Sequence, residues 1–90
     1  MLSAQDGWEH DPTEISDSDR AIYERAARPA RPVVLVMRSH TGALGRAYAQ
    51  AFASLGEAFM RAEQAWERSG HATAPLWISD GVGRYLPMKH

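Results

Sequence analysis

The longest regular pattern of hydrophobic residues lies in the middle of the chain, where large side chains recur at alternating spacings of three and four residues. This spacing places side chains along one strip of an α-helix, and a row of alanines forms a second strip beside it. We therefore predict one long amphipathic helix over residues 42–69, which Gly70 ends. The main strip consists of Gly45, Tyr48, Phe52, Leu55, Phe59, Ala62 and Trp66.

A shorter helix is predicted ahead of the long one, over residues 17–28. Ser16 or Ser18 is suited to cap its first turn, because a serine hydroxyl accepts a hydrogen bond from a free backbone N–H. Pro29 and Pro32 end this helix, since proline lacks the N–H that a helix needs and disfavours helical dihedral angles in the residue before it.

Residues 33–37, with the sequence VVLVM, allow two interpretations. A short, continuous run of apolar and mostly β-branched residues is typical of a buried strand. Alternatively, Pro32 opens one continuous helix over residues 33–68, because proline is favoured at the first position of a helix. Gly42 and Gly45 weigh against the helix, since glycine costs about 1 kcal/mol relative to alanine in a helix interior.

The C-terminal segment carries the pattern of a β-hairpin. Asp80 and Gly81 separate apolar stretches over residues 76–79 and 82–86, and an Asp-Gly pair suits the positive backbone angles of a two-residue turn. Such a turn would pair Trp77 with Arg84, whose guanidinium group would then stack over the indole ring.

These elements predict an α+β fold that is predominantly helical, with a short N-terminal helix, a short strand, one long amphipathic helix and a C-terminal hairpin. The continuous-helix interpretation instead predicts an all-α fold with an irregular tail. Residues 1–15 contain scattered acidic residues, Gly7 and Pro12 without an apolar period. We therefore expect a disordered acidic arm over residues 1–15 and a single small domain over residues 16–90.

Charge is distributed unevenly along the chain. The first 19 residues carry six acidic groups and no lysine or arginine, whereas residues 20–38 are the most basic segment. This segment suggests an alternative function as a small nucleic-acid-binding regulatory protein, although a pI near 6.4 is low for that class. The candidate contacts to a phosphate or a partner are Arg20, Arg25, Arg28, Arg31, Arg38, Trp77 and Arg84.

Few residues suggest catalytic chemistry. The four histidines lie far apart and lack the spacing typical of metal sites. Ser39, His40 and Asp80 supply the residue types of a catalytic triad, but no nucleophile elbow or oxyanion hole accompanies them. We therefore predict a protein that is not an enzyme, with no catalytic residues, cofactor or metal.

The remaining pattern favours a protein–protein interaction or accessory protein with a regulatory role. A helix with two apolar strips needs more surface to pack against than 90 residues provide, so we predict a homodimer that also binds a protein partner. The predicted interaction seam consists of Tyr48, Phe52, Leu55, Phe59 and Trp66.

No run of about 18 apolar residues occurs in the sequence, so we expect no membrane association and a cytoplasmic location. Nine arginines stand against one lysine, in a chain rich in alanine. This bias indicates a genome of high GC content and suggests an actinobacterial or phage origin.

Overall fold

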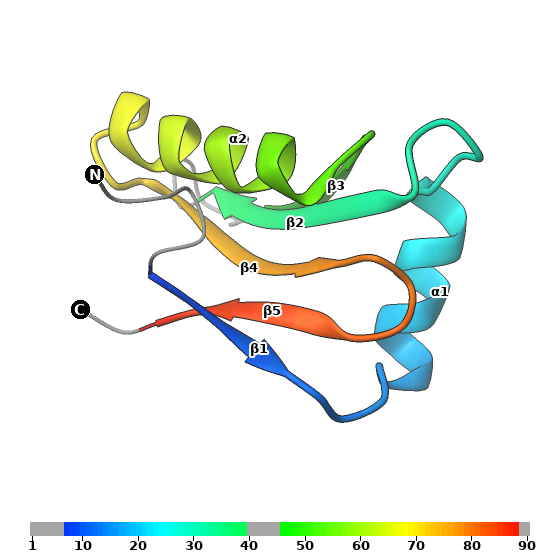
Figure 1. Ribbon diagram of the computed structural model, residues 1–90. Coiled ribbons are helices and arrows are strands. Elements are labelled where there is room, and N and C mark those ends of the chain that lie inside the picture. Colours follow the sequence, from blue (N-terminus) through cyan, green and yellow to red (C-terminus); the bar gives the residue numbers. More distant parts are fainter. Residues whose placement is uncertain (1–6, 40–45, 89–90) are drawn as a thin grey trace.

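A computed structural model describes residues 7–39 and 46–88, which form a five-stranded antiparallel sheet with a helix on each face (Figure 1). The strands lie in the order β1-β5-β4-β2-β3. In chain order the elements are β1 (Trp8–Asp11), α1 (Asp17–Ala26), β2 (Val33–Ser39), β3 (Arg46–Phe52), α2 (Leu55–Arg68), β4 (Thr73–Ser79) and β5 (Arg84–Pro87).

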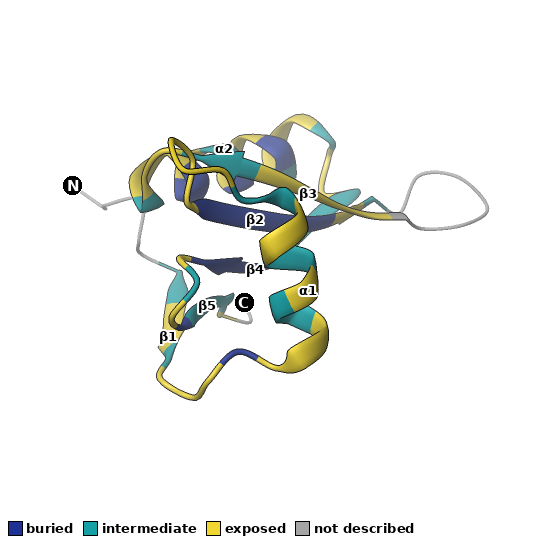
Figure 2. Ribbon diagram, turned by 90° about the vertical axis from the view of Figure 1, so that its right-hand side faces the viewer, coloured by how far each residue is buried: buried dark blue, intermediate teal, exposed yellow. Residues whose placement is uncertain are grey.

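The apolar run at residues 33–37 forms most of β2, which confirms the strand interpretation of that segment. All five side chains are buried, and they alternate between two clusters on opposite faces of the sheet. Val33, Leu35 and Met37 pack against α2, whereas Val34 and Val36 face α1. A strand that is apolar on both faces needs cover on both, and the two helices provide it (Figure 2).

The long helix predicted over residues 42–69 is wrong, and so is the continuous-helix alternative. Residues 46–52 form strand β3, and α2 begins only at Leu55. Ser54 caps α2 by accepting from the N–H of Glu57 at 3.2 Å, and the Glu57 carboxylate accepts from the N–H of Ala53 at 3.1 Å. This reciprocal cap starts a new helix at the point where the predicted helix would have continued.

The spacing of the large residues explains the error. Tyr48 and Phe52 are four residues apart, which suits one face of a helix, but an even spacing also places both on one face of a strand. The chain is therefore a small α+β domain with two short helices and a five-stranded sheet, rather than a predominantly helical one. Residues 42–45 of the predicted helix lie outside the described residues.

The N-terminal helix is confirmed as α1, with Ser16 accepting from the N–H of Asp19 at 3.2 Å. The C-terminal hairpin is confirmed as β4 and β5, but its predicted register is wrong. Ser79 pairs with Arg84, so the turn holds four residues rather than two. The Ser79 hydroxyl donates to the Gly83 carbonyl at 2.7 Å and accepts from the Gly81 N–H at 3.0 Å, which stabilises the longer turn.

The turn after β4 also fits closely against α1. Gly81 has a φ of +95°, and a Cβ atom there would lie 2.9 Å from the ring of Tyr23. The Tyr23 hydroxyl lies between the carbonyls of Pro32 and Asp80 and is within hydrogen-bonding distance of both. Glycine is therefore required at position 81 both by the backbone conformation and by the close approach of the aromatic ring.

Part of the segment expected to be a disordered arm is an edge strand. Trp8–Asp11 form β1, which pairs antiparallel with β5. The guanidinium group of Arg84 contacts Asp11 on β1 at 3.2 Å and Asp19 on α1 at 2.7 Å. This Asp11–Arg84–Asp19 bridge connects β1, β5 and α1, and it gives Arg84 a different partner from the Trp77 ring predicted for it.

The main core lies between α2 and the sheet, and Phe59 is at its centre. Its ring contacts Trp8 at a centroid distance of 5.2 Å and Tyr85 edge-on at 5.3 Å. These three aromatic residues come from α2, β1 and β5, so their packing holds the N-terminal strand and the C-terminal strand against the helix. In the described part of the chain, no helix has the length and apolar character needed to cross a membrane.

We expect Phe59→Ala to lower the free energy of unfolding by about 3–5 kcal/mol, because it leaves a cavity among three elements. The neighbouring Met60 is 55% exposed, so Met60→Ala is the matched control and should cost less than about 0.5 kcal/mol. Urea unfolding followed by circular dichroism measures both values. Equal effects of the two substitutions would contradict this placement of the core.

We also expect the Asp11 carboxylate, which accepts hydrogen bonds from Thr13 and Arg84, to make stability depend on pH. Hydrogen bonds from the side chain and then the backbone of Thr13, followed by the hydrogen bond from Arg84, lower the pKa of Asp11 below its usual value. The folded state then binds fewer protons than the unfolded state, so this stabilisation is complete above about pH 4 and is lost as pH falls through the folded pKa.

The destabilisation caused by Asp11→Asn should accordingly be largest near neutral pH and should shrink in acid. Thr13→Val removes one hydrogen-bond donor while keeping the Asp11 charge, so it should show the same trend with a smaller amplitude. Thermal melts between pH 2 and pH 7 measure this difference. A destabilisation that stayed the same across that range would contradict the assignment.

Candidate binding groove

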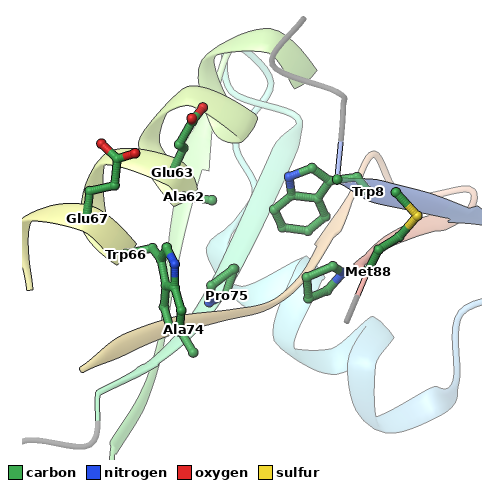
Figure 3. Close-up of a pocket in the computed structure, with 10 residues that line it drawn as sticks. Trp8, Ala62, Glu63, Trp66, Glu67, Ala74, Pro75 and Met88 are labelled. Atoms are coloured by element: carbon green, nitrogen blue, oxygen red, sulfur yellow. The ribbon is translucent and has the colours of Figure 1, made fainter. Parts of the chain in front are cut away.

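A groove of about 420 Å³ lies on the α2 side of the sheet, where the helix meets β1, β4 and β5 (Figure 3). Most of its lining is apolar, and two exposed glutamates on α2 stand at its rim. We refer to it as the Trp8–Trp66 groove. Its lining residues are Gly7, Trp8, Ala62, Glu63, Trp66, Glu67, Ala74, Pro75, Pro87 and Met88.

The two tryptophans reach the groove from different elements. Trp8 belongs to β1, and its ring packs against Phe59 in the core. Trp66 belongs to the last turns of α2, and its ring stacks on His71 with the centroids 4.3 Å apart and the planes 9° from parallel. Figure 3 shows Trp8 and Trp66 on opposite sides of the groove, with Pro75 between them.

The chain reversal after α2 explains why His71 lies against Trp66. Gly70 and His71 both have positive φ angles, of 63° and 72°, and the His71 N–H donates to the Trp66 carbonyl at 2.9 Å. A positive φ is uncommon for a residue other than glycine. The stacked contact with Trp66 accompanies this conformation and restricts the movement of the indole ring.

An irregularity in β4 shapes the floor of the groove. The pairing of β2 with β4 shifts between Val36 and Met37, so that these residues face Trp77 and Pro75 respectively. Proline has no N–H to donate to a neighbouring strand and is therefore found at such irregular positions. Pro75 and Ala74 present small apolar surfaces beneath α2, which leaves room between the two tryptophans.

A hydrogen bond connects two lining residues of the groove that are far apart in the sequence. The N–H of Met88 donates to the Gly7 carbonyl at 2.7 Å, which extends the pairing of β1 with β5 by one further contact. Met88 is 46% exposed, and its thioether side chain borders the groove. A flexible methionine adapts its shape to an incoming apolar group more readily than a branched residue does.

Electrostatically the groove is acidic. Glu63 and Glu67 are four residues apart on α2, so their carboxylates lie on the same side of the helix, and among the residues that the structure describes no basic side chain lines the groove. Figure 3 shows both carboxylates projecting from α2 above the apolar lining. The arrangement is suited to hold an apolar group between aromatic walls and a positive charge at the rim.

A second hollow of about 440 Å³ lies on the other side of α2, toward β3. It contains both signs of charge, because Arg31 and Arg61 share it with Glu57, and the Glu57 carboxylate already caps α2. Among the described residues, no cluster of three or more acidic or histidine side chains could hold a metal ion. The Trp8–Trp66 groove has the more apolar lining of the two, and we therefore treat it as the candidate binding site.

The structure distributes the five residues of the predicted seam over different environments. Tyr48 is 43% exposed on β3, and Phe59 is fully buried. Phe52 and Leu55 pack at the margin of the core, and only Trp66 lines the groove. The five side chains therefore do not form the continuous strip on a helix that was predicted for them.

The arginines of the predicted basic segment are distributed over several elements. Arg20 and Arg25 belong to α1, Arg38 lies in β2, and Arg31 borders the second hollow beside α2. Arg28 donates to the carbonyls of Arg25 and Ala27 at 2.9 and 2.8 Å.

The two remaining candidate contacts have structural partners. Trp77 is only 6% exposed and packs with Val34 and Val36 on the α1 side of the sheet. Arg84 is held between Asp11 and Asp19.

The site residues predicted from the sequence did not include Trp8, Glu63, Glu67 or Met88. The spacing of Glu63, Trp66 and Glu67 does place them near one another on a helix, and this is the local signal that was present. Trp8 and Met88 are brought to the groove by the pairing of β1 with β5, two strands that lie far apart in the sequence.

Comparison of the chain with protein-family models, with curated protein sequences and with solved structures finds no match in any of the three. The case for a function therefore depends on the residues of the groove and on the fold that positions them.

Proposed function

We propose that the protein is a non-enzymatic interaction module that binds a basic, partly apolar segment of a partner protein in the Trp8–Trp66 groove. The observation that carries this proposal is the pairing of two tryptophan walls, supplied by β1 and α2, with an acidic rim. A role in regulation or as an accessory subunit is consistent with binding of this kind.

The tryptophan walls support binding of a protein segment. Tryptophan is enriched among the residues that contribute most to protein–protein affinity, because its large ring buries much apolar area while restricting few torsion angles. His71 and Phe59 already hold the two rings in place, so little conformational freedom is lost when a partner binds.

The acidic rim specifies the chemistry of the partner. Glu63 and Glu67 attract lysine or arginine side chains, and the same cation also interacts favourably with the face of a nearby tryptophan. A segment with basic residues next to an aromatic or aliphatic residue matches both features of the groove. Within residues 7–39 and 46–88, the ionisable groups that line the groove are the two exposed glutamates, with no nucleophile beside them, and this favours binding over catalysis.

The proposal can be tested by selecting ligands from a random peptide library displayed on phage. We expect the enriched peptides to carry lysine or arginine close to an aromatic or aliphatic residue. Glu63→Lys/Glu67→Lys should weaken their binding about tenfold or more, which corresponds to roughly 1.4 kcal/mol. Glu14→Lys/Glu24→Lys makes the same change in net charge at exposed positions outside the groove, so it should bind like the unmodified protein.

Nuclear magnetic resonance can locate the bound peptide, because the three tryptophans give three separate indole N–H signals. Binding should shift the signals of Trp8 and Trp66 and leave that of Trp77 in place, since Trp77 is buried on the opposite face of the sheet. Equal binding by the Glu63→Lys/Glu67→Lys variant, or a shift confined to Trp77, would contradict the proposal. Binding of a DNA or RNA oligonucleotide in preference to the peptides would favour the arginine-rich segment instead.

A further inference from the structure

Strand β3 lies at the edge of the sheet, with β2 as its partner on one side among the described residues. It spans seven residues, and its register with β2 continues without a shift from Val33↔Phe52 to Ser39↔Arg46. From Ala47 to Phe52 it contains no charged residue and no proline. A long, regular and uncharged edge strand presents a row of backbone donors and acceptors to any further strand.

The opposite edge of the same sheet is different. Strand β1 has four residues, and Glu9 and Asp11 place negative charge along it. Short, charged edge strands resist pairing with other chains. The contrast between the two edges indicates that pairing is blocked at β1 and left open at β3.

The composition of β3 indicates that pairing with a second strand would stabilise it. Its side chains alternate between Ala47, Ala49 and Ala51 on the α1 face and Tyr48, Gln50 and Phe52 on the α2 face. Alanine is a poor strand former and buries little apolar area. The residues from Ala47 to Gln50 are exposed, so this part of β3 buries little side-chain surface within one chain.

We propose that β3 pairs antiparallel with β3 of a second copy of the chain, about a twofold axis at Ala49. This register sets Tyr48 opposite Gln50 of the partner subunit and Ala47 opposite Ala51 of the partner subunit. No like charges are opposed between Ala47 and Phe52, and alanines meet alanines on the α1 face. The edge is therefore complementary to itself, which is what a symmetric dimer requires.

The dimer extends the sheet to ten strands and is independent of the groove. The groove lies near β1, β5 and β4, whereas β3 forms the other edge. Because an antiparallel pair keeps the faces of the sheet aligned, both copies present the Trp8–Trp66 groove on the same face. A partner with two basic segments would then bind both grooves of one dimer, with a gain from effective concentration.

Light scattering coupled to size-exclusion chromatography tests the dimer over a series of protein concentrations. The unmodified protein should reach twice the 10.0 kDa of one chain as the concentration rises. Ala49→Lys and Ala49→Glu should each remain monomeric, because each places like charges opposite each other at the twofold axis. An equimolar mixture of the two variants should recover the dimer, since a lysine then faces a glutamate.

Recovery on mixing excludes misfolding as the cause of the loss, and circular dichroism of each variant checks its folding directly. Glu9→Lys and Glu9→Gln change the charge of the opposite edge strand, so they should leave the dimer intact. A mass of 10.0 kDa for the unmodified protein at every concentration would overturn the proposal. It would also be overturned by a dimer that both Ala49 variants leave intact, or by variants that stay monomeric when mixed.

Discussion

The burial of β2 on both faces is the constraint on which the rest of this fold depends. Five consecutive apolar residues, Val33–Met37, cannot be covered from one side, so a helix is needed above the sheet and another below it. Burial of apolar surface stabilises the folded state by about 25 cal/mol per Å². The two hydrophobic clusters packed around β2 therefore supply the main driving force for folding in a chain of this size. The Asp11–Arg84–Asp19 bridge and the contact of Tyr23 with Gly81 then fix the periphery around that centre.

Both proposed interaction surfaces follow from the order of strands around β2. On one side, the pairing of β4, β5 and β1 brings Trp8 close to α2, the helix that carries Trp66, Glu63 and Glu67. On the other side, β3 is the last strand and contributes mostly alanines. The groove and the β3 edge therefore lie at opposite ends of one sheet, so the two proposed contacts do not overlap.

Local signals in the sequence predicted several elements correctly. The apolar run gave β2, the serine at position 16 gave the start of α1, and the Asp-Gly pair gave the position of the hairpin. Strand β3 was missed because Tyr48 and Phe52 satisfy both a helical and a strand spacing, and the cap formed by Ser54 and Glu57 decides between them. Strand β1 and the groove were missed for another reason, since they exist only through the pairing of residues 8–11 with residues 84–87. Such pairing depends on contacts between distant parts of the chain that no local pattern specifies.

Amide hydrogen exchange of the intact protein tests most directly whether β2 is the centre on which the fold depends. Strand β2 has hydrogen-bonded neighbours on both sides and buried side chains on both faces, whereas α1 contains no fully buried residue. We expect the β2 amides to be among the slowest to exchange and to do so only through global unfolding, while the α1 amides exchange faster through local opening. Exchange of the β2 amides at the rate seen in α1 would contradict this account.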